Sequence, residues 1–180
     1  MDTSAFIFPG QGSQSFGMGK DFYENDEKAK EMFECASDRL KLDFKSLLFF
    51  YYDKLEKTEY TQPAILLVSC IAHELFIRAT EKTPTLALGH SLGEFSALGA
   101  VGALDYLDAL ELVHKRGLFM KEACEGVNAG MMALIGLEDA KAEAIIKDAN
   151  ENGKRVWPAN YNSDGQLVIA GNREDLSSLE

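Results

Sequence analysis

Short apolar runs alternate with helix-like stretches along the first two thirds of the chain. The runs at 5–8 and 85–88 are almost wholly apolar, and each stops at a glycine-containing turn, which is typical of a buried parallel strand. Elsewhere apolar residues recur at the helical period, and this predicts helices at 26–40, 43–52, 61–79, 94–98 and 105–121. The alternation of strands and helices indicates an α/β fold with a parallel sheet.

The pattern changes after the glycine-containing stretch 126–130. We expect, in order, a strand at 131–135, a helix at 139–149, strands at 156–161 and 166–170 around a turn at 162–165, and a further helix from Arg173. This β-α-β-β order resembles an incomplete ferredoxin-like α+β unit. The sequence therefore predicts two domains, 1–126 and 127–180, of which the second is truncated.

Composition excludes several functional classes. The 180 residues carry a formal net charge of −11, spread along the chain as 14 acidic and 10 basic residues before Ser91 and 15 and 8 from it onward. Without a basic stripe to neutralise phosphates, we expect no nucleic-acid partner. The apolar run 64–68 is far too short to span a bilayer, and no signal peptide is recognisable at the start. The three scattered cysteines suggest neither a disulfide framework nor a metal site, which fits a cytoplasmic protein.

The first candidate for chemistry is the serine at the centre of Gly89-His90-Ser91-Leu92-Gly93. A Gly-x-Ser-x-Gly turn between a strand and a helix exposes the serine hydroxyl at the tip of a sheet, where it can act as a nucleophile and become acylated. The glycines are required because a Cβ at either position would crowd the crossing backbone. The alternative is a serine that only caps the following helix.

A second loop follows the first predicted strand, and both loops should emerge at the carboxyl edge of the sheet. If the two strands are neighbours, the loop Gly10-Gln11-Gly12-Ser13-Gln14 lies beside Ser91. The N–H groups of Gln11 and Leu92 would then form an oxyanion hole. The alternatives are a plain glycine turn or a phosphate cradle, although the loop lacks the Lys-Ser/Thr ending of a P-loop.

Arg116 falls on the apolar stripe of its predicted helix, together with Ala109, Leu112, Val113 and Met120. A guanidinium group there needs a partner. Three explanations stay open: an internal ion pair with a glutamate, a side chain whose tip reaches solvent, or a bidentate site for the carboxylate of a substrate.

The histidines provide no obvious general base for Ser91. His90 adjoins the serine and should diverge from its hydroxyl, His114 should face solvent, and His73 should be a hydrogen-bonded core residue. A serine nucleophile without a base is only weakly activated.

Several motifs together resemble those of the malonyl-CoA:acyl carrier protein transacylases. They are Phe8-Pro9-Gly10-Gln11-Gly12-Ser13-Gln14, Thr61-Gln62-Pro63-Ala64, Gly89-His90-Ser91-Leu92-Gly93-Glu94, Lys115-Arg116-Gly117 and Asn160-Tyr161-Asn162-Ser163. The resemblance implies an α/β-hydrolase-like core, here incomplete, with an inserted ferredoxin-like subdomain. It implies that Ser91 is acylated, that Gln11 and Leu92 supply the oxyanion donors, and that Arg116 holds the malonyl carboxylate. Gln62, Met120 and Asn160 would line the site.

The resemblance also implies an activity and its partners. Ser91 would take the malonyl group from malonyl-CoA and pass it to the phosphopantetheine thiol of acyl carrier protein, in fatty acid biosynthesis, without a cofactor or metal. We expect a cytoplasmic monomer. The family's catalytic histidine lies in a Gly-x-x-His segment beyond the second subdomain, so the chain is interpreted as an N-terminal portion. Two other hypotheses stay open: an α/β serine hydrolase or thioesterase, and a non-catalytic fragment that binds CoA or carrier protein.

Overall fold

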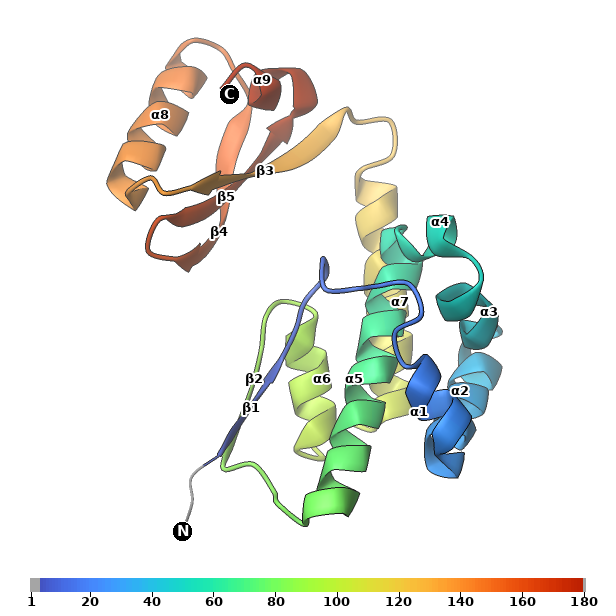
Figure 1. Ribbon diagram of the computed structural model, residues 1–180. Coiled ribbons are helices and arrows are strands. Elements are labelled where there is room, and N and C mark those ends of the chain that lie inside the picture. The colour runs from blue at the N-terminus through green and yellow to red at the C-terminus, as the bar shows by residue number, and fades with distance from the viewer. Residues whose placement is uncertain (1–3, 180) are drawn as a thin grey trace. The chain divides into compact units, whose positions relative to one another are not determined.

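The computed structural model describes residues 4–179. The chain forms two compact units, Met1–Ala123 and Cys124–Glu180, which we call the N-terminal and the C-terminal unit (Figure 1). Each unit combines strands with helices, so the predicted mixed α/β class is confirmed. The division of the domains at residue 126 stays a prediction.

The N-terminal unit holds a small parallel sheet and a set of helices. Its elements are β1 (Ala5–Phe8), α1 (Lys20–Asn25), α2 (Glu27–Leu40), α3 (Phe44–Phe49), α4 (Tyr52–Leu55), α5 (Thr58–Thr80), β2 (Leu86–Gly89), α6 (Gly93–Ala100) and α7 (Tyr106–Ala123). β1 and β2 pair in parallel with Phe8 opposite Gly89, as the two apolar runs predicted. The helix predicted at 43–52 is instead two short helices, α3 and α4, separated at residues 50 and 51.

The core of the N-terminal unit is built around α5. The first half of this helix is apolar almost all round, so it is buried on most sides by its neighbours (Figure 1). The α5–α7 contact is close, since a Cβ on Gly117 would lie 2.7 Å from the Cα of Glu59. By length and composition alone α5 could also cross a membrane. The buried core helix of a soluble protein meets that test too, so it is weak evidence for a membrane segment.

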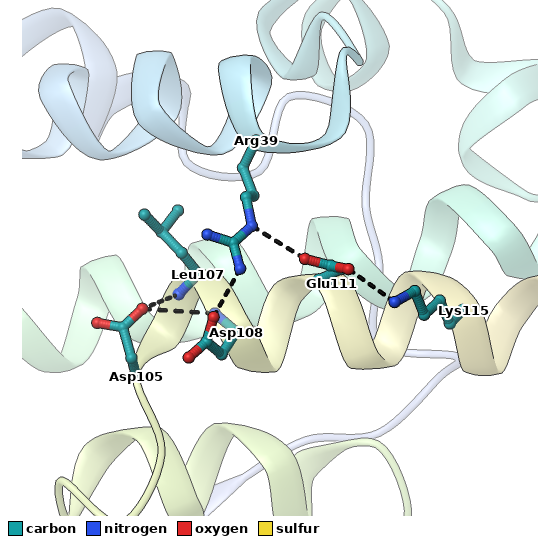
Figure 2. A network of polar contacts seen from close by, with 6 residues as sticks. All are labelled: Arg39, Asp105, Leu107, Asp108, Glu111 and Lys115. Carbon is teal, nitrogen blue, oxygen red and sulfur yellow. Dashed lines mark hydrogen bonds and ion pairs between the residues drawn. The ribbon is translucent and has the colours of Figure 1, made fainter.

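A chain of surface ion pairs connects α2 with α7 (Figure 2). Arg39 lies 2.6 Å from Asp108 and 3.0 Å from Glu111, and Glu111 also binds Lys115 at 2.7 Å. Asp105 precedes α7 and accepts a hydrogen bond from the N–H of Leu107 at 2.9 Å, so its side chain caps the start of this helix. Because these groups are largely exposed, the network contributes little to stability.

The C-terminal unit has its own sheet and its own core. Its elements are β3 (Ala129–Ile135), α8 (Asp139–Glu151), β4 (Val156–Ser163), β5 (Gln166–Asn172) and α9 (Arg173–Ser177). The strands form an antiparallel sheet in the order β3-β5-β4. Leu167 and Ile169 of β5 are buried in a cluster with Ile146 of α8 and Leu176 of α9. The predicted β-α-β-β order and its final helix are confirmed.

Candidate active site

Ser91 lies in a tight turn that only this glycine spacing permits. Its φ of 53° is in the left-handed region, which a residue with a Cβ rarely adopts. A Cβ on Gly89 would lie 1.9 Å from the carbonyl carbon of Gly93, and a Cβ on Gly93 would lie 2.2 Å from the carbonyl oxygen of Phe8. The turn therefore presses β2, α6 and the end of β1 together, and it leaves Ser91 exposed at the start of α6.

The loop after β1 lies against this turn, as the parallel pairing predicted. The N–H of His90 donates to the carbonyl oxygen of Phe8 at 3.2 Å, and a Cβ on Gly10 would lie 2.6 Å from the carbonyl oxygen of His90. Among the described residues, the N–H groups of Gln11 and Leu92 make no hydrogen bond. Two free donors on adjacent loops are what an oxyanion hole requires.

Arg116 reaches the serine from α7. Its Nη2 donates to the Oγ of Ser91 at 3.0 Å, and its Nη1 donates to the Oε1 of Gln62 at 2.7 Å. Both partners are neutral, and no ion pair within residues 4–179 includes Arg116. The internal ion pair that the sequence left open is therefore absent from the described part of the chain. A half-buried guanidinium without a counter-charge, placed next to an exposed serine, is suited to bind an anionic substrate group.

The side-chain amides of Gln62 and Gln11 form a hydrogen-bonded series that ends at Arg116. Gln62 of α5 is fully buried, and its Nε2 lies 3.4 Å from the Oε1 of Gln11 and 3.2 Å from the Sδ of Met120. The Nε2 of Gln11 in turn donates to the Oγ1 of Thr58 at 3.0 Å. The structure thus brings together Ser91, Gln11, Leu92, Gln62, Arg116 and Met120, all of which the sequence singled out. It adds Thr58, which the sequence analysis missed.

An apolar groove of about 500 Å³ borders Arg116 between α6 and α7. It is lined by Phe95, Leu112, Lys115, Arg116, Phe119, Met120 and Ala123. Leu112 and Met120 are 46% and 41% exposed, so only Ala109 and Val113 of the predicted stripe are core residues. The site is therefore a cationic group at the edge of an apolar surface.

Two of the three histidines differ from their predicted environments. His114 does not simply face solvent: it is half-buried, and its Nδ1 lies 2.9 Å from the carbonyl oxygen of Glu59. Pro63, four residues after Glu59, has no N–H to donate to that carbonyl within α5, so His114 takes the place of the missing donor. A proline four residues after a helical carbonyl was the sequence signal for this contact.

His73 is also not the hydrogen-bonded residue that was predicted. It lies against the rings of Phe6 and Phe8, and its buried Nε2 has no hydrogen-bond partner among the described residues. Burial lowers the pKa of His73, which favours its neutral form.

Asn160 belongs to β4 of the C-terminal unit, where it is half-buried and paired with Val168 of β5. Its assignment to the site stays a prediction.

Comparison with known proteins gives one consistent family. The model of the acyl transferase domain matches residues 5–179. The chain is 42% identical to malonyl CoA-acyl carrier protein transacylase of Bacillus subtilis (strain 168) over 172 residues, which cover 95% of this chain and 54% of that protein. It is also 42% identical to the Escherichia coli (strain K12) protein of the same name over 175 residues, which cover 97% and 56%.

Solved structures agree with the sequence relatives. The malonyl-CoA:acyl carrier protein transacylase of Helicobacter pylori superimposes with a TM-score of 0.92 and 46% identity, over 99% of this chain and 57% of that chain. A malonyl-transacylase solved in complex with a type II PKS acyl-carrier protein superimposes with a TM-score of 0.87 and 38% identity, over 98% of this chain and 57% of that chain. The chain thus spans just over half the length of these relatives.

Proposed function

The chain belongs to the acyl transferase domain family, and from this membership we propose that it transfers the malonyl group of malonyl-CoA to acyl carrier protein through a malonyl-serine intermediate, in fatty acid biosynthesis. The observation that carries the proposal is the guanidinium of Arg116, which lies 3.0 Å from the Oγ of Ser91 and has only neutral partners. A cation at the nucleophile fits an acyl group that ends in a carboxylate. It has no evident use in a hydrolase of uncharged acyl groups.

In the proposed reaction, the Oγ of Ser91 attacks the thioester carbonyl carbon while its proton passes to a base. The negative charge that develops on the carbonyl oxygen is stabilised by the N–H groups of Gln11 and Leu92. The C–S bond breaks, CoA leaves as the thiol, and an ester to Ser91 remains. The phosphopantetheine thiol of the carrier protein then attacks this ester and regenerates the serine, which is a ping-pong scheme.

The remaining predicted residues have supporting roles. Arg116 binds the malonyl carboxylate, Gln62 orients the guanidinium, and Met120 and Asn160 line the site. None of His73, His90 and His114 is assigned as the base. We place the base in the part of the family domain that this chain does not span.

The finer architecture and the setting belong to the same proposal. Residues 1–126 would be the N-terminal part of an α/β-hydrolase-like core, and residues 127–180 the start of a ferredoxin-like subdomain. The strand order β3-β5-β4 supports the second assignment. The enzyme would need no cofactor, act in the cytoplasm as a monomer, and have acyl carrier protein as its macromolecular partner.

Acylation of Ser91 tests the proposal directly. In a protein that spans the whole family domain and so includes the base, we expect malonyl-CoA to add one malonyl group. The adduct would be detected by intact mass and located on Ser91 by peptide mapping, and Ser91→Ala should abolish it. Arg116→Ala should lower the rate constant for malonyl transfer by about 10- to 100-fold, because hydrogen bonds to a charged group are lost. Transfer of acetyl from acetyl-CoA, which has no carboxylate, should change by less than about threefold.

Arg116→Lys serves as the matched control for charge. It keeps the positive charge but loses the two-pronged geometry, so it should recover only part of the malonyl preference. An equal loss for malonyl and acetyl in Arg116→Ala would show that Arg116 is structural. Continued release of CoA in the absence of carrier protein, with no adduct accumulating, would indicate a thioesterase. Neither release of CoA nor an adduct would indicate a non-catalytic binding fragment.

A further inference from the structure

We propose that Thr58 is a positioning residue, which fixes the guanidinium of Arg116 through the side chains of Gln11 and Gln62. Thr58 is the first residue of α5. Its hydroxyl is hydrogen-bonded to Gln11, and it has no direct hydrogen bond to Ser91 or Arg116 among the described residues. Its consequence for acyl selectivity rests on the proposed function, whereas the placement of Arg116 does not.

The direction of each hydrogen bond follows from Arg116. A guanidinium can only donate, so the Oε1 of Gln62, at 2.7 Å from Nη1, must be the acceptor. The Nε2 of Gln62 therefore points the other way, toward the Oε1 of Gln11 at 3.4 Å and the Sδ of Met120 at 3.2 Å. Within residues 4–179, the Oε1 of Gln11 is then the only oxygen acceptor of this amide. The other acceptor is the sulfur of Met120, which accepts weakly.

The same constraint passes from Gln11 to Thr58. With its Oε1 directed at Gln62, Gln11 must direct its Nε2 at the Oγ1 of Thr58, 3.0 Å away. Gln11 is exposed on a loop, so its side chain would otherwise exchange partners with water. Thr58 is thus the fixed acceptor at the end of a polar chain that runs Thr58, Gln11, Gln62, Arg116, Ser91.

Thr58 can serve as a fixed point because the start of α5 is held on several sides. Its carbonyl oxygen would lie 2.9 Å from a Cβ on Gly117, so α7 packs directly on it. The next residue, Glu59, is buried, forms an ion pair with Lys121 at 2.9 Å, and has its carbonyl bound by His114. The hydroxyl of Thr58 therefore gives the flexible side chain of Gln11 a fixed hydrogen-bond acceptor at a rigid helix end.

Loss of the Thr58 hydroxyl as an acceptor should change the position of the Arg116 guanidinium. If Gln11 turns into solvent, the fully buried amide of Gln62 keeps only the sulfur of Met120 as an acceptor. A rotation of this amide by 180° then becomes less unfavourable, and it would present Nε2, a donor, to the donor Nη1 of Arg116. The guanidinium would lose its support and with it a defined position beside Ser91.

Nuclear magnetic resonance of the chain tests the placement without any substrate. In Thr58→Val, which keeps the shape but removes the acceptor, we expect the side-chain amide signals of Gln11 and Gln62 and the Nε–Hε signal of Arg116 to shift. Thr58→Ser should restore all three signals. Thr80→Val, which removes a hydroxyl bonded to the carbonyl of Phe76 at the other end of α5, should leave them unchanged. An unchanged Arg116 signal in Thr58→Val would overturn the proposal.

Gln11→Met supplies a second route that does not disturb α5. It removes the side-chain hydrogen bonds but keeps the backbone N–H, and it should reproduce the Arg116 shift. Thr58→Val added to Gln11→Met should then have no further effect on Arg116, since Thr58 acts through Gln11. An additional shift of similar size in the double variant would show that Thr58 acts by another route and would also overturn the proposal.

Acyl selectivity gives the functional readout. Thr58→Val should lower the malonyl transfer rate constant about threefold to tenfold, the effect of one neutral hydrogen bond, and change acetyl transfer by less than about twofold. Thr58→Ser should restore the ratio, which a general loss of stability would not do. If a protein that spans the whole family domain forms no malonyl adduct while the Arg116 signal still responds to Thr58, the proposed function fails and the positioning role stands. An unchanged ratio in an active enzyme would refute the role in selectivity.

Discussion

At the scale of single residues, the candidate site depends on two different kinds of constraint. Ser91 is held by its backbone, which adopts a left-handed φ of 53° between two glycines that admit no side chain. Arg116 is held by its side chain, through hydrogen bonds to neutral oxygens of Gln62 and Ser91. The first constraint fixes a hydroxyl in space, and the second leaves a positive charge available beside it.

The backbone constraint can be tested at Gly93. Gly93→Ala places a Cβ 2.2 Å from the carbonyl oxygen of Phe8, so β1 or the turn must move. We expect the free energy of unfolding to fall by about 3 kcal/mol, measured by urea denaturation, and the yield of the Ser91 adduct to fall with it.

Gly99→Ala in the same helix is the matched control. Its Cβ would meet the Sγ of Cys70 at 3.7 Å, which is an ordinary contact. Alanine is also favoured over glycine within a helix by up to about 1 kcal/mol, so this variant should be neutral or slightly stabilising. If Gly93→Ala were tolerated as well as Gly99→Ala, the turn would be less constrained than the structure indicates.

Some features of these single residues could be predicted from the sequence, and others could not. The motif around Ser91 and the position of Arg116 on its helix could both be predicted, because each depends only on the spacing of residues along the chain. The partners of Arg116 were not, because Gln62 lies on a different helix, and only the packing of α5 on α7 brings the two together. Thr58 was missed for the same reason, since its role depends on a loop 47 positions earlier in the chain.

At the scale of elements, the crossing of α5 and α7 organises the site. The predicted helices are present where the apolar periodicity indicated, except that the one at 43–52 is divided into α3 and α4. For α7, however, the helical wheel predicts solvent exposure for polar residues away from the apolar stripe. His114 departs from that rule because Pro63 leaves the carbonyl of Glu59 without a donor within α5, and a neighbouring helix supplies one. Periodicity predicts which face is apolar, but it does not show which polar groups a neighbour needs.

The buried end of this crossing predicts a pH-dependent stability. Burial by itself raises the pKa of Glu59. The hydrogen bond from Lys121 and its positive charge lower the pKa and outweigh burial, so the pKa lies below its usual value. A carboxyl whose pKa is lower in the folded state stabilises the fold above its unfolded pKa, and this stabilisation is lost as the pH falls through the folded pKa. We expect Lys121→Met to reduce the free energy of unfolding by about 1–3 kcal/mol at neutral pH, because Glu59 is left buried and unpaired.

The loss caused by Lys121→Met should shrink as Glu59 becomes protonated in acid, as measured by urea denaturation across that pH range. Lys115→Met removes an exposed partner of Glu111 on the same helix and should cost less than about 0.5 kcal/mol at any pH. An equal loss for Lys121→Met in neutral and acidic solution would mean that its carbon chain, and not its charge, supports Glu59.

At the scale of the whole molecule, the change of hydrophobic pattern near residue 126 predicted a second unit with the element order β-α-β-β and a final helix, and that succession of elements is observed. Local patterning suffices for the hairpin of β4 and β5, because these antiparallel neighbours are joined by a short turn. Where Asn160 stands relative to Ser91 is a different kind of question, because it depends on how two units combine and not on the pattern within either one. The candidate site was therefore predictable in so far as it lies within the N-terminal unit.

Among the described residues, the two hydrophobic cores have no member in common, and this predicts that a destabilising substitution in one unit leaves the other folded. Leu167 is fully buried in the C-terminal unit, and Leu167→Ala should cost about 2–4 kcal/mol through lost contacts and a cavity. Hydrogen exchange followed by mass spectrometry should then show faster exchange across β3, β4 and β5, while the amides of α5 keep their protection. Leu110→Ala, in the fully buried core of the N-terminal unit, should give the reverse pattern. Loss of protection in α5 on substitution of Leu167 would mean that the units unfold together, in which case the position of Arg116 beside Ser91 also depends on the C-terminal unit.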